Sequence, residues 1–348
     1  MTETRASDAS GRMSVGAIEH ELARLRMNDD GTIGLRASVL NLVVVTSEEA
    51  APAVTELVSG LSGRFPCRAI VFISEPEAPH DDFDVGLAAF CSTRGGGQVC
   101  AEQITIHACG APARHLESLA EPLLIPDLPV FLFYPDEFDP DAGEFESMVS
   151  LADRLIVDSG RASDPEGFLR RLSLLAEDPG VPDLGDLEWV ALSPWRALLA
   201  DMFSPPERAG MLEGIERVRM VHDGGGEGRA RALLFAGWLA ASLGWEPEEG
   251  GSFSGPGGGI EVLFEEGDGA PLRRVEVSVR DLVFRVSRCR DAAEFRAEVE
   301  RGGEIMAGRT VHLGYSSVEE ILGEELQHRG DDRNLLDALK VVGRMVER

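Results

Sequence analysis

The chain has 348 residues with 33 lysines and arginines against 61 aspartates and glutamates, so its formal net charge is −28 and its pI is near 4.6. Such an acidic chain is repelled by nucleic-acid phosphates and anionic lipids, so we expect neither nucleic acid nor a membrane as a partner. The five cysteines match no disulfide framework, which predicts reduced thiols. No apolar run approaches the roughly 20 residues that span a bilayer, and the N-terminus lacks the apolar core of a signal peptide. Together these features predict a soluble cytoplasmic protein.

The N-terminal part alternates helical segments with apolar strand-like runs. Residues 1–12 are polar, and apolar side chains at spacings of three and four then predict a short helix at 15–25. β-Branched runs predict strands at 38–46 and 69–74, with a helix at 48–61 between them. This strand–helix–strand order is typical of a parallel pair in a sheet that is covered on both faces.

The next segment continues the same sheet. Runs at 85–91 and 99–108 flank a loop with three glycines, which predicts an antiparallel hairpin. Further elements are expected in the order helix 114–123, strand 130–134, strand 155–158 and helix 165–176. We therefore expect a mixed α/β domain at 35–182, preceded by a polar tail and short helix at 1–34.

The remaining residues, 183–348, predict an α+β domain with a largely antiparallel sheet. Its expected elements are helix 194–203, strand 217–222, an almost wholly apolar helix at 230–243, a glycine-rich loop at 246–259, strands at 260–264, 273–280, 282–289 and 310–313, and helices at 317–328 and 332–346. The strands at 273–280 and 282–289 are joined so tightly that an antiparallel hairpin is expected.

Known catalytic and cofactor motifs are missing from the sequence. Lys340, the only lysine, follows Leu339, so no P-loop is present. The glycine clusters at 95–97, 224–226 and 257–259 all fail the Gly-x-Gly-x-x-Gly pattern of dinucleotide sites. We therefore predict no catalytic residue, no cofactor and no metal, and do not expect an enzyme.

One predicted strand carries two cysteines and a histidine, which are residue types that bind metal ions. Alternation along the strand at 99–108 and its continuation places His107 and Cys109 on one face and Cys100 on the other. Two ligands do not make a zinc site, and Cys91 could add a third only in a favourable register, so buried thiols are the preferred interpretation. A redox sensor remains an alternative, and it requires two cysteines whose Cα atoms lie within about 7 Å.

Arginines gather on the predicted hairpin at 273–289. Such a cluster in an acidic chain could receive an anionic ligand or an acidic partner surface. Pairing across the strands with Glu276 and neighbouring glutamates is the alternative. A sugar-phosphate-binding module would show a pocket with Arg280 or Arg285 beside a carboxylate of shifted pKa. The candidate anion-binding residues are Arg274, Arg280, Arg285 and Arg288.

Several segments, taken in order, resemble the glucose-6-phosphate dehydrogenase assembly protein family, often called OpcA. They are RASVLNLVVV (36–45), PCRAIV (66–71), QVCAEQITI (98–106), LLIPDLPVFL (123–132), LADRLIVDS (151–159), LSPWRALL (192–199), LLFAGWLAASLGW (233–245) and the tail at 321–339. Two positions depart from the family pattern. Phe133-Tyr134 replace a pair of tryptophans found in many members, and Ala101 follows Cys100 where two adjacent cysteines are common.

The resemblance implies a non-catalytic role. Family members promote the active oligomer of glucose-6-phosphate dehydrogenase or activate it allosterically, and that enzyme opens the oxidative pentose phosphate pathway and produces NADPH. The dehydrogenase is therefore the expected partner, and a homo-oligomer is possible. Exposed aromatic and arginine anchors and rigid proline loops favour docking, which selects Asp127, Pro129, Trp195 and Arg196 as candidate partner-binding residues. Trp195 could instead fill the domain junction, and Asp127 could cap a turn.

Overall fold

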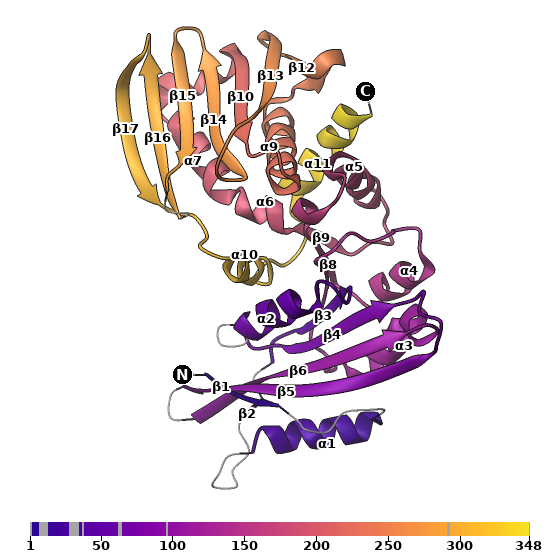
Figure 1. Cartoon of the computed structure of the whole chain (residues 1–348). Helices are drawn as coiled ribbons and strands as arrows, with labels where there is room; N and C mark the ends of the chain where they lie inside the picture. The colour runs from indigo at the N-terminus through magenta and orange to yellow at the C-terminus, as the bar shows by residue number, and fades with distance from the viewer. Residues whose placement is uncertain are drawn as a thin grey trace. The chain divides into compact units, whose positions relative to one another are not determined.

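The computed structural model describes residues 2–6, 13–27, 35–36, 38–61, 65–94, 97–290 and 293–347, and the chain divides into two compact units (Figure 1). The first unit comprises Met1–Val157 with Gly180–Asp183, and the second comprises Asp158–Pro179 with Leu184–Arg348. The chain therefore passes between the units at 157/158, 179/180 and 183/184, whereas a single boundary was expected at 182/183. The helix at 165–175, however, belongs to the second unit, because it packs against helices of that unit.

The first unit is built on one mixed sheet, with the strand order β1-β5-β6-β4-β3-β7-β8 and β9 next in the order. The pairs β3/β4, β4/β6, β3/β7 and β7/β8 are parallel, whereas β5/β6 and β1/β5 are antiparallel and the short β2 pairs with β6. The strands are β1 (Thr2–Ala6), β2 (Leu35–Arg36), β3 (Asn41–Thr46), β4 (Arg68–Glu75), β5 (Asp82–Arg94), β6 (Gly97–Cys109), β7 (Val130–Tyr134), β8 (Arg154–Val157) and β9 (Asp183–Asp186).

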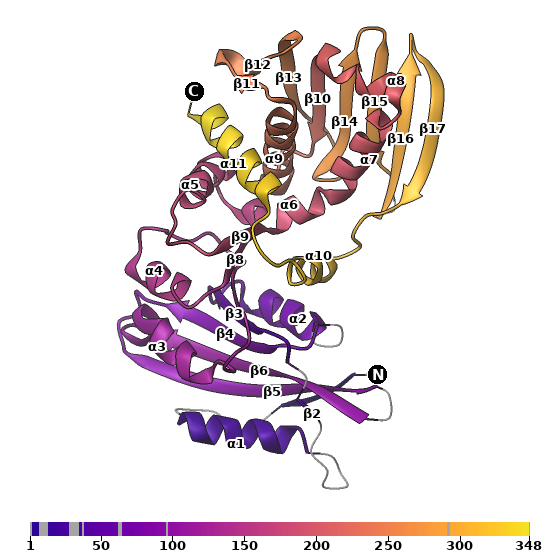
Figure 2. The same cartoon turned by 180° about the vertical axis from the view of Figure 1, so that it is seen from behind.

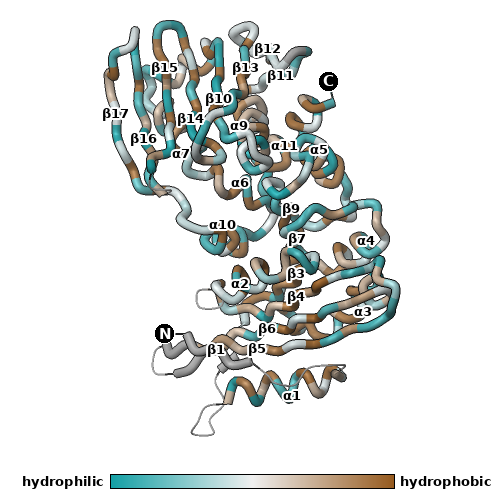
Figure 3. The backbone as a smooth tube through the Cα atoms, in the orientation of Figure 1, coloured by the Kyte–Doolittle hydropathy of each residue, from teal (hydrophilic) through white to brown (hydrophobic). Residues whose placement is uncertain are grey.

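Helices cover both faces of this sheet. Figures 1 and 2 show α1 and α2 on opposite sides of it. The central strands are therefore buried on both faces, as in β7, where all five residues are buried. Hydrophobic residues gather along β3 and β4 in Figure 3. The helices are α1 (Val15–Leu25), α2 (Ala51–Leu61), α3 (Leu116–Ala120) and α4 (Gly143–Val149).

The second unit is built on an eight-stranded sheet with the order β11-β12-β13-β10-β14-β15-β16-β17. Only β10 and β13 pair in parallel, and the other neighbours are antiparallel. The strands are β10 (Ile215–His222), β11 (Glu246–Pro247), β12 (Ser252–Gly255), β13 (Gly258–Glu266), β14 (Leu272–Val279), β15 (Leu282–Arg288), β16 (Glu294–Arg301) and β17 (Glu304–His312). An α/β unit followed by a largely antiparallel α+β unit confirms the predicted fold class.

One face of the second sheet is covered by helices (Figure 2). The long α9 lies against β10 and β14, and α7 lies against β15 and β16. The α9 segment is buried nearly all round because α11 and α5 pack on it as well. The helices are α5 (Pro165–Leu175), α6 (Leu187–Ala191), α7 (Ser193–Phe203), α8 (Pro206–Ala209), α9 (Gly226–Leu243), α10 (Val318–Glu325) and α11 (Arg333–Val346). Among the described helices, none has the length and apolar character needed to cross a bilayer.

Three local expectations need correction. Residues 2–6, expected in a polar tail, form β1 along β5. The strand β16 was not predicted, and β17 begins at Glu304 rather than at residue 310. Part of the expected loop at 246–259 forms β12 and the start of β13, where four residue pairs join the two strands.

Candidate functional site

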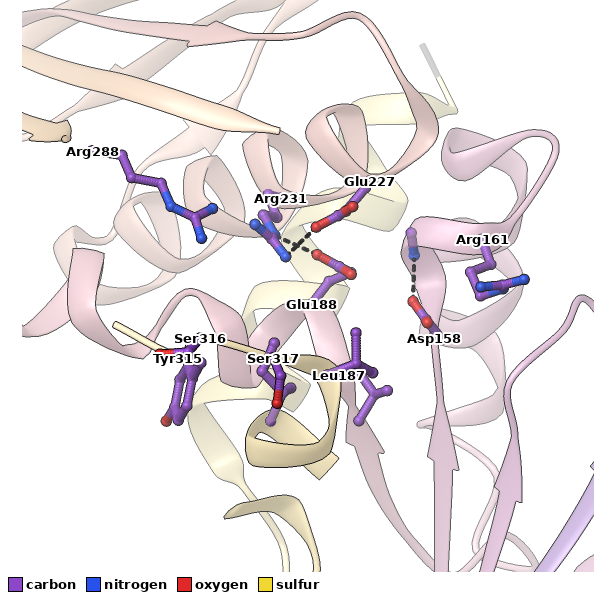
Figure 4. Close-up of a pocket in the computed structure, with 13 residues that line it drawn as sticks. Asp158, Arg161, Leu187, Glu188, Glu227, Arg231, Arg288, Tyr315, Ser316 and Ser317 are labelled. Carbon is purple, nitrogen blue, oxygen red and sulfur yellow. Dashed lines mark hydrogen bonds and ion pairs between the residues drawn. The ribbon is translucent and has the colours of Figure 1, made fainter. Parts of the chain in front are cut away.

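A charged cavity of about 250 Å³ lies within the second unit (Figure 4). Its walls come from the short 3-10 turn at Ser159–Arg161, from α6, from the first turns of α9, from the end of β15 and from the segment that starts α10. The lining residues are Asp158, Gly160, Arg161, Leu187, Glu188, Glu227, Arg231, Arg288, Tyr315, Ser316, Ser317, Val318 and Ile321.

Helix starts bring these side chains together. Asp158 caps the 3-10 turn by accepting a hydrogen bond from the Gly160 N–H at 3.2 Å. Asp186 caps α6 by accepting from the Glu188 N–H at 2.9 Å, and it also accepts from the Ser159 N–H at 3.3 Å. Ser317 caps α10. Short polar residues are favoured at these positions because they satisfy backbone donors that have no partner within the helix.

Arg231 is the buried charge at the centre of the site. Its side chain is 6% exposed and pairs with Glu188, which is 7% exposed. Glu227, one turn earlier on α9, pairs with the same guanidinium. Figure 4 shows both carboxylates pointing toward Arg231, with the Arg288 guanidinium on the other side of it. A buried ion pair of this kind persists because each charge would be very costly without the other.

The acids of the site hold protons more tightly than ordinary carboxyls. Burial raises the pKa of Asp158 to about 7, and the nearby charge of Asp186 adds to this effect. Burial raises the pKa of Asp186 to about 6. Burial also raises the pKa of Glu188, although Arg231 opposes this. Near neutral pH the site can therefore offer both carboxyl donors and carboxylate acceptors.

Arg288 faces the cavity close to another cation. Burial lowers its pKa, and the charge of Arg231 lowers it further. The cavity is lined by the three arginines Arg161, Arg231 and Arg288. Together with the hydroxyls of Ser316 and Ser317, they provide donors suited to an anionic or hydroxyl-rich ligand.

The other three arginines of the predicted anion-binding cluster lie elsewhere. Arg285 and Arg274 pair with Glu276 at 2.7 and 3.5 Å, which is the cross-strand alternative considered from the sequence. Arg280 occupies the turn between β14 and β15 with φ of 54°. Because Arg285 and Arg288 are three residues apart on one strand, alternation sends them to opposite faces of the sheet. The cavity thus contains Arg288, and neither Arg280 nor Arg285 lines it.

Two candidate partner-binding residues point into the second unit. Trp195 is 1% exposed and packs edge-on against Phe295, with ring centroids 5.1 Å apart. Arg196 lies 3.5 Å above the Trp189 ring and donates to the Trp189 carbonyl at 2.8 Å. Burial lowers the pKa of Arg196 to about 10. Trp195 is therefore a core residue and not an exposed anchor, whereas Arg196 is partly buried against Trp189.

The other two candidates lie on a well-anchored loop of the first unit. Asn41, which is fully buried, donates from its side chain to the carbonyls of Ile125 and Leu128 and accepts from the Ile125 N–H at 2.9 Å. This loop presents Asp127 to solvent with φ of 64°, and Pro129 is partly exposed. The loop therefore has the rigidity and exposure expected of a docking element.

The sequence analysis did not identify the buried acids or Arg231 as site residues. They are separated by up to 73 positions, between residues 158 and 231, and no local motif joins them. One signal was present: Arg231 stands inside an otherwise apolar helical run, and a buried arginine requires an acidic partner.

The cysteines differ from the expected reduced set. Cys91 and Cys100 form a disulfide between facing positions of β5 and β6, with their Cα atoms 4.1 Å apart. The hairpin register places both side chains on one face, so Cys91 is joined to Cys100 and does not lie beside His107. Their Cα separation meets the requirement of about 7 Å for the redox-sensor alternative. Both cysteines, however, are at most 1% exposed.

Comparisons with known proteins agree with the resemblance. A family model described as "Glucose-6-phosphate dehydrogenase subunit N-terminal domain" matches residues 58–174, and the corresponding C-terminal domain model matches residues 182–339. The chain is 35% identical over 188 residues to the "Putative OxPP cycle protein OpcA" of Nostoc punctiforme, covering 53% of this chain and 39% of that protein. It is 31% identical over 186 residues to the protein of the same name from Synechocystis sp., covering 52% and 38%.

The matched region is thus less than half the length of each of these relatives. Among solved structures, the chain is similar to the dehydrogenase MviM from Clostridium difficile at 12% identity and a TM-score of 0.45, covering 88% of this chain and 97% of that chain. A likeness at that level carries no argument about function. The two domain models, matched in order along most of the chain, show that it belongs to the OpcA family of glucose-6-phosphate dehydrogenase subunits.

Proposed function

We propose that the chain is a non-catalytic partner of glucose-6-phosphate dehydrogenase in the oxidative pentose phosphate pathway, which promotes the active oligomer of that enzyme or activates it allosterically. The observation that carries this proposal is the ordered match of both subunit domain models. Such an effect requires tighter binding to the active state of the enzyme than to the inactive state. A coupling of about 1–3 kcal/mol changes substrate affinity roughly 5- to 150-fold.

The cavity of the second unit supports a binding role. Its described lining residues include the hydroxyls of Tyr315, Ser316 and Ser317, while the carboxylates of Glu188 and Glu227 pair with Arg231 and that of Asp158 accepts from the Gly160 N–H. An activated nucleophile requires an adjacent base within hydrogen-bond reach. The arrangement is therefore more typical of a ligand or structural site than of nucleophilic catalysis.

A kinetic titration tests the proposal directly. We expect that adding the full chain to the glucose-6-phosphate dehydrogenase of the same organism lowers KM for glucose 6-phosphate or raises activity, by roughly 5-fold or more, with saturation at a fixed molar ratio. Size-exclusion chromatography should show the two proteins eluting together. Unchanged kinetics combined with separate elution would remove the proposal.

The Asn41-anchored loop provides a matched pair of variants. If Asp127 contacts the enzyme, Asp127→Asn should raise the concentration of chain needed for half-saturation, because asparagine keeps the left-handed backbone but loses the charge. Glu121→Gln, at an exposed position of the same unit, should leave the titration unchanged. Equal behaviour of the two variants would exclude Asp127 from the interface.

The charged cavity favours a second candidate function, the binding of a small sugar phosphate. Here Arg288, and not Arg280 or Arg285, would receive the anionic group, while the carboxyl and serine groups would bind hydroxyls. Calorimetric titration with glucose 6-phosphate, 6-phosphogluconate and inorganic phosphate should show saturable binding of at least one of them. Arg288→Met should weaken that binding at least 10-fold, whereas Arg217→Met, on an exposed strand position, should not. Absence of binding by all three compounds would set this candidate aside.

A further inference from the structure

Three side chains of different chemistry converge at one edge of the first unit. Glu75 ends β4 and Cys109 ends β6, and the parallel register of the two strands sets these residues opposite each other. His107 lies two residues before Cys109 and so projects from the same face. The potential ligand atoms of the three residues all lie within 4.8 Å of one another.

The distances between these atoms resemble those around a tetrahedral metal ion. Cys109 Sγ lies 3.8 Å from Glu75 Oε1 and 3.9 Å from His107 Nε2, and the imidazole is hydrogen-bonded to the carboxylate. Metal–ligand bonds of about 2.0–2.3 Å at tetrahedral angles separate neighbouring ligands by roughly 3.3–3.8 Å. The sulfur is therefore already close to a ligating position, and only the histidine–glutamate contact must widen.

We propose that Glu75, His107 and Cys109 form a binding site for a divalent transition-metal ion, Zn²⁺ in the first instance, with a further coordination position left open. The ligand set is one nitrogen, one oxygen and one sulfur. Mg²⁺ and Ca²⁺ prefer oxygen ligands alone, whereas imidazole and thiolate select Zn²⁺ and related ions. Three protein ligands with an open fourth position match the pattern of zinc sites that accept water or another group.

The surroundings suit a cation. The side chains of His107 and Glu75 are 39% and 35% exposed, which gives the ion a path from solvent, while Cys109 is 7% exposed. Asp82 pairs with Cys109 across β5 and β6, and its charge and that of Glu48 both act on the thiol. Because the strands are fixed by a continuous hydrogen-bonded ladder, the site is held on rigid elements.

This arrangement explains why the sequence alone left the site incomplete. The sequence placed His107 and Cys109 on one face and offered Cys91 as a third ligand, but buried thiols were preferred and no metal was predicted. Cys91 is instead joined to Cys100, and the third ligand comes from β4, 32 residues before His107. Only the register of β4 against β6 brings Glu75 to the other two.

The test is metal titration of the full chain after treatment with a chelator, under anaerobic conditions and without added thiol so that the Cys91–Cys100 disulfide stays closed. Calorimetry should show one equivalent of Zn²⁺ bound saturably. With Co²⁺ in place of Zn²⁺, absorption should show thiolate-to-metal charge transfer. His107→Ala and Cys109→Ser should each weaken Zn²⁺ affinity at least about 100-fold, because losing even an outer-shell partner of a metal ligand costs about 10–100-fold.

Matched controls use a cysteine and a histidine away from the cluster. Cys289→Ser, in the second unit, and His115→Ala, whose side chain is 71% exposed, should keep wild-type affinity. His107 is exposed enough for its variant to fold, so it decides the matter even if Cys109→Ser is unstable. The proposal is overturned if the wild-type chain binds no Zn²⁺ saturably, or if His107→Ala binds it as tightly as wild type.

Discussion

Replacing Arg231 with methionine is expected to destabilise the second unit by about 3–5 kcal/mol. The guanidinium is 6% exposed and holds Glu188, which is 7% exposed, together with Glu227. The substitution leaves the buried Glu188 carboxylate without the cation that pairs with it. All four tryptophans lie between residues 189 and 245, so urea unfolding followed by tryptophan fluorescence reports on the second unit specifically.

Two further variants separate charge from packing. Arg217→Met removes a pair with Glu261 whose side chains are 55% and 51% exposed, and it should cost less than about 1 kcal/mol. The double variant Arg231→Met with Glu188→Gln should recover part of the lost stability, because it buries no net charge. If the double variant is no more stable than Arg231→Met alone, Arg231 acts through the packing of its aliphatic stem and not through its charge.

Strands that are buried on both faces were among those that could be predicted from the sequence. Both β3 and β7 are nearly continuous apolar runs, and Pro129 and Pro135 mark the two ends of β7. In contrast, β17 is exposed along almost its whole length, and only its C-terminal end was predicted, as part of a strand at 310–313. The local signal for its hairpin was Gly302-Gly303, both of which adopt positive φ in the turn between β16 and β17.

The candidate site was less accessible to sequence reasoning because burial of a charge depends on partners that are distant along the chain. Arg231 and Glu188 are 43 residues apart and come from different helices. The sequence indicated Arg288 as an anion-binding residue, in one cluster with Arg285. Alternation along β15 instead sends these two side chains to opposite faces of the sheet. Likewise, Trp195 and Arg196 had the residue types of an interface anchor, and a Trp–Arg pair beside a helix start serves equally well in a core.

The second large effect that we expect is a loss of stability of the second unit as the pH rises from about 4 to about 7. The pKa of Asp158 is raised from 3.8 to about 7 and that of Asp186 to about 6, mainly by burial. At pH values between 3.8 and its raised pKa, each of these two carboxyls stays protonated in the folded chain but is ionised in the unfolded chain. Stability therefore falls with rising pH, by up to about 1.4 kcal/mol per pH unit for each group.

The variant Asp158→Asn isolates this effect from the many other carboxyls of the chain. Asparagine keeps an oxygen that can accept from the Gly160 N–H but does not titrate. Wild type and variant should have similar stability below about pH 3, where Asp158 is protonated in both the folded and the unfolded chain. The variant should then become the more stable of the two, by at most about 4 kcal/mol at pH 7 to 8. Parallel profiles in tryptophan-monitored unfolding would mean that Asp158 is ionised in the folded chain. If the two stability profiles diverge as the pH rises, Asp158 is a neutral carboxyl in the folded chain at these pH values. It can then donate a hydrogen bond to a ligand beside Arg231. Ligand affinity should therefore change over the same pH range as stability.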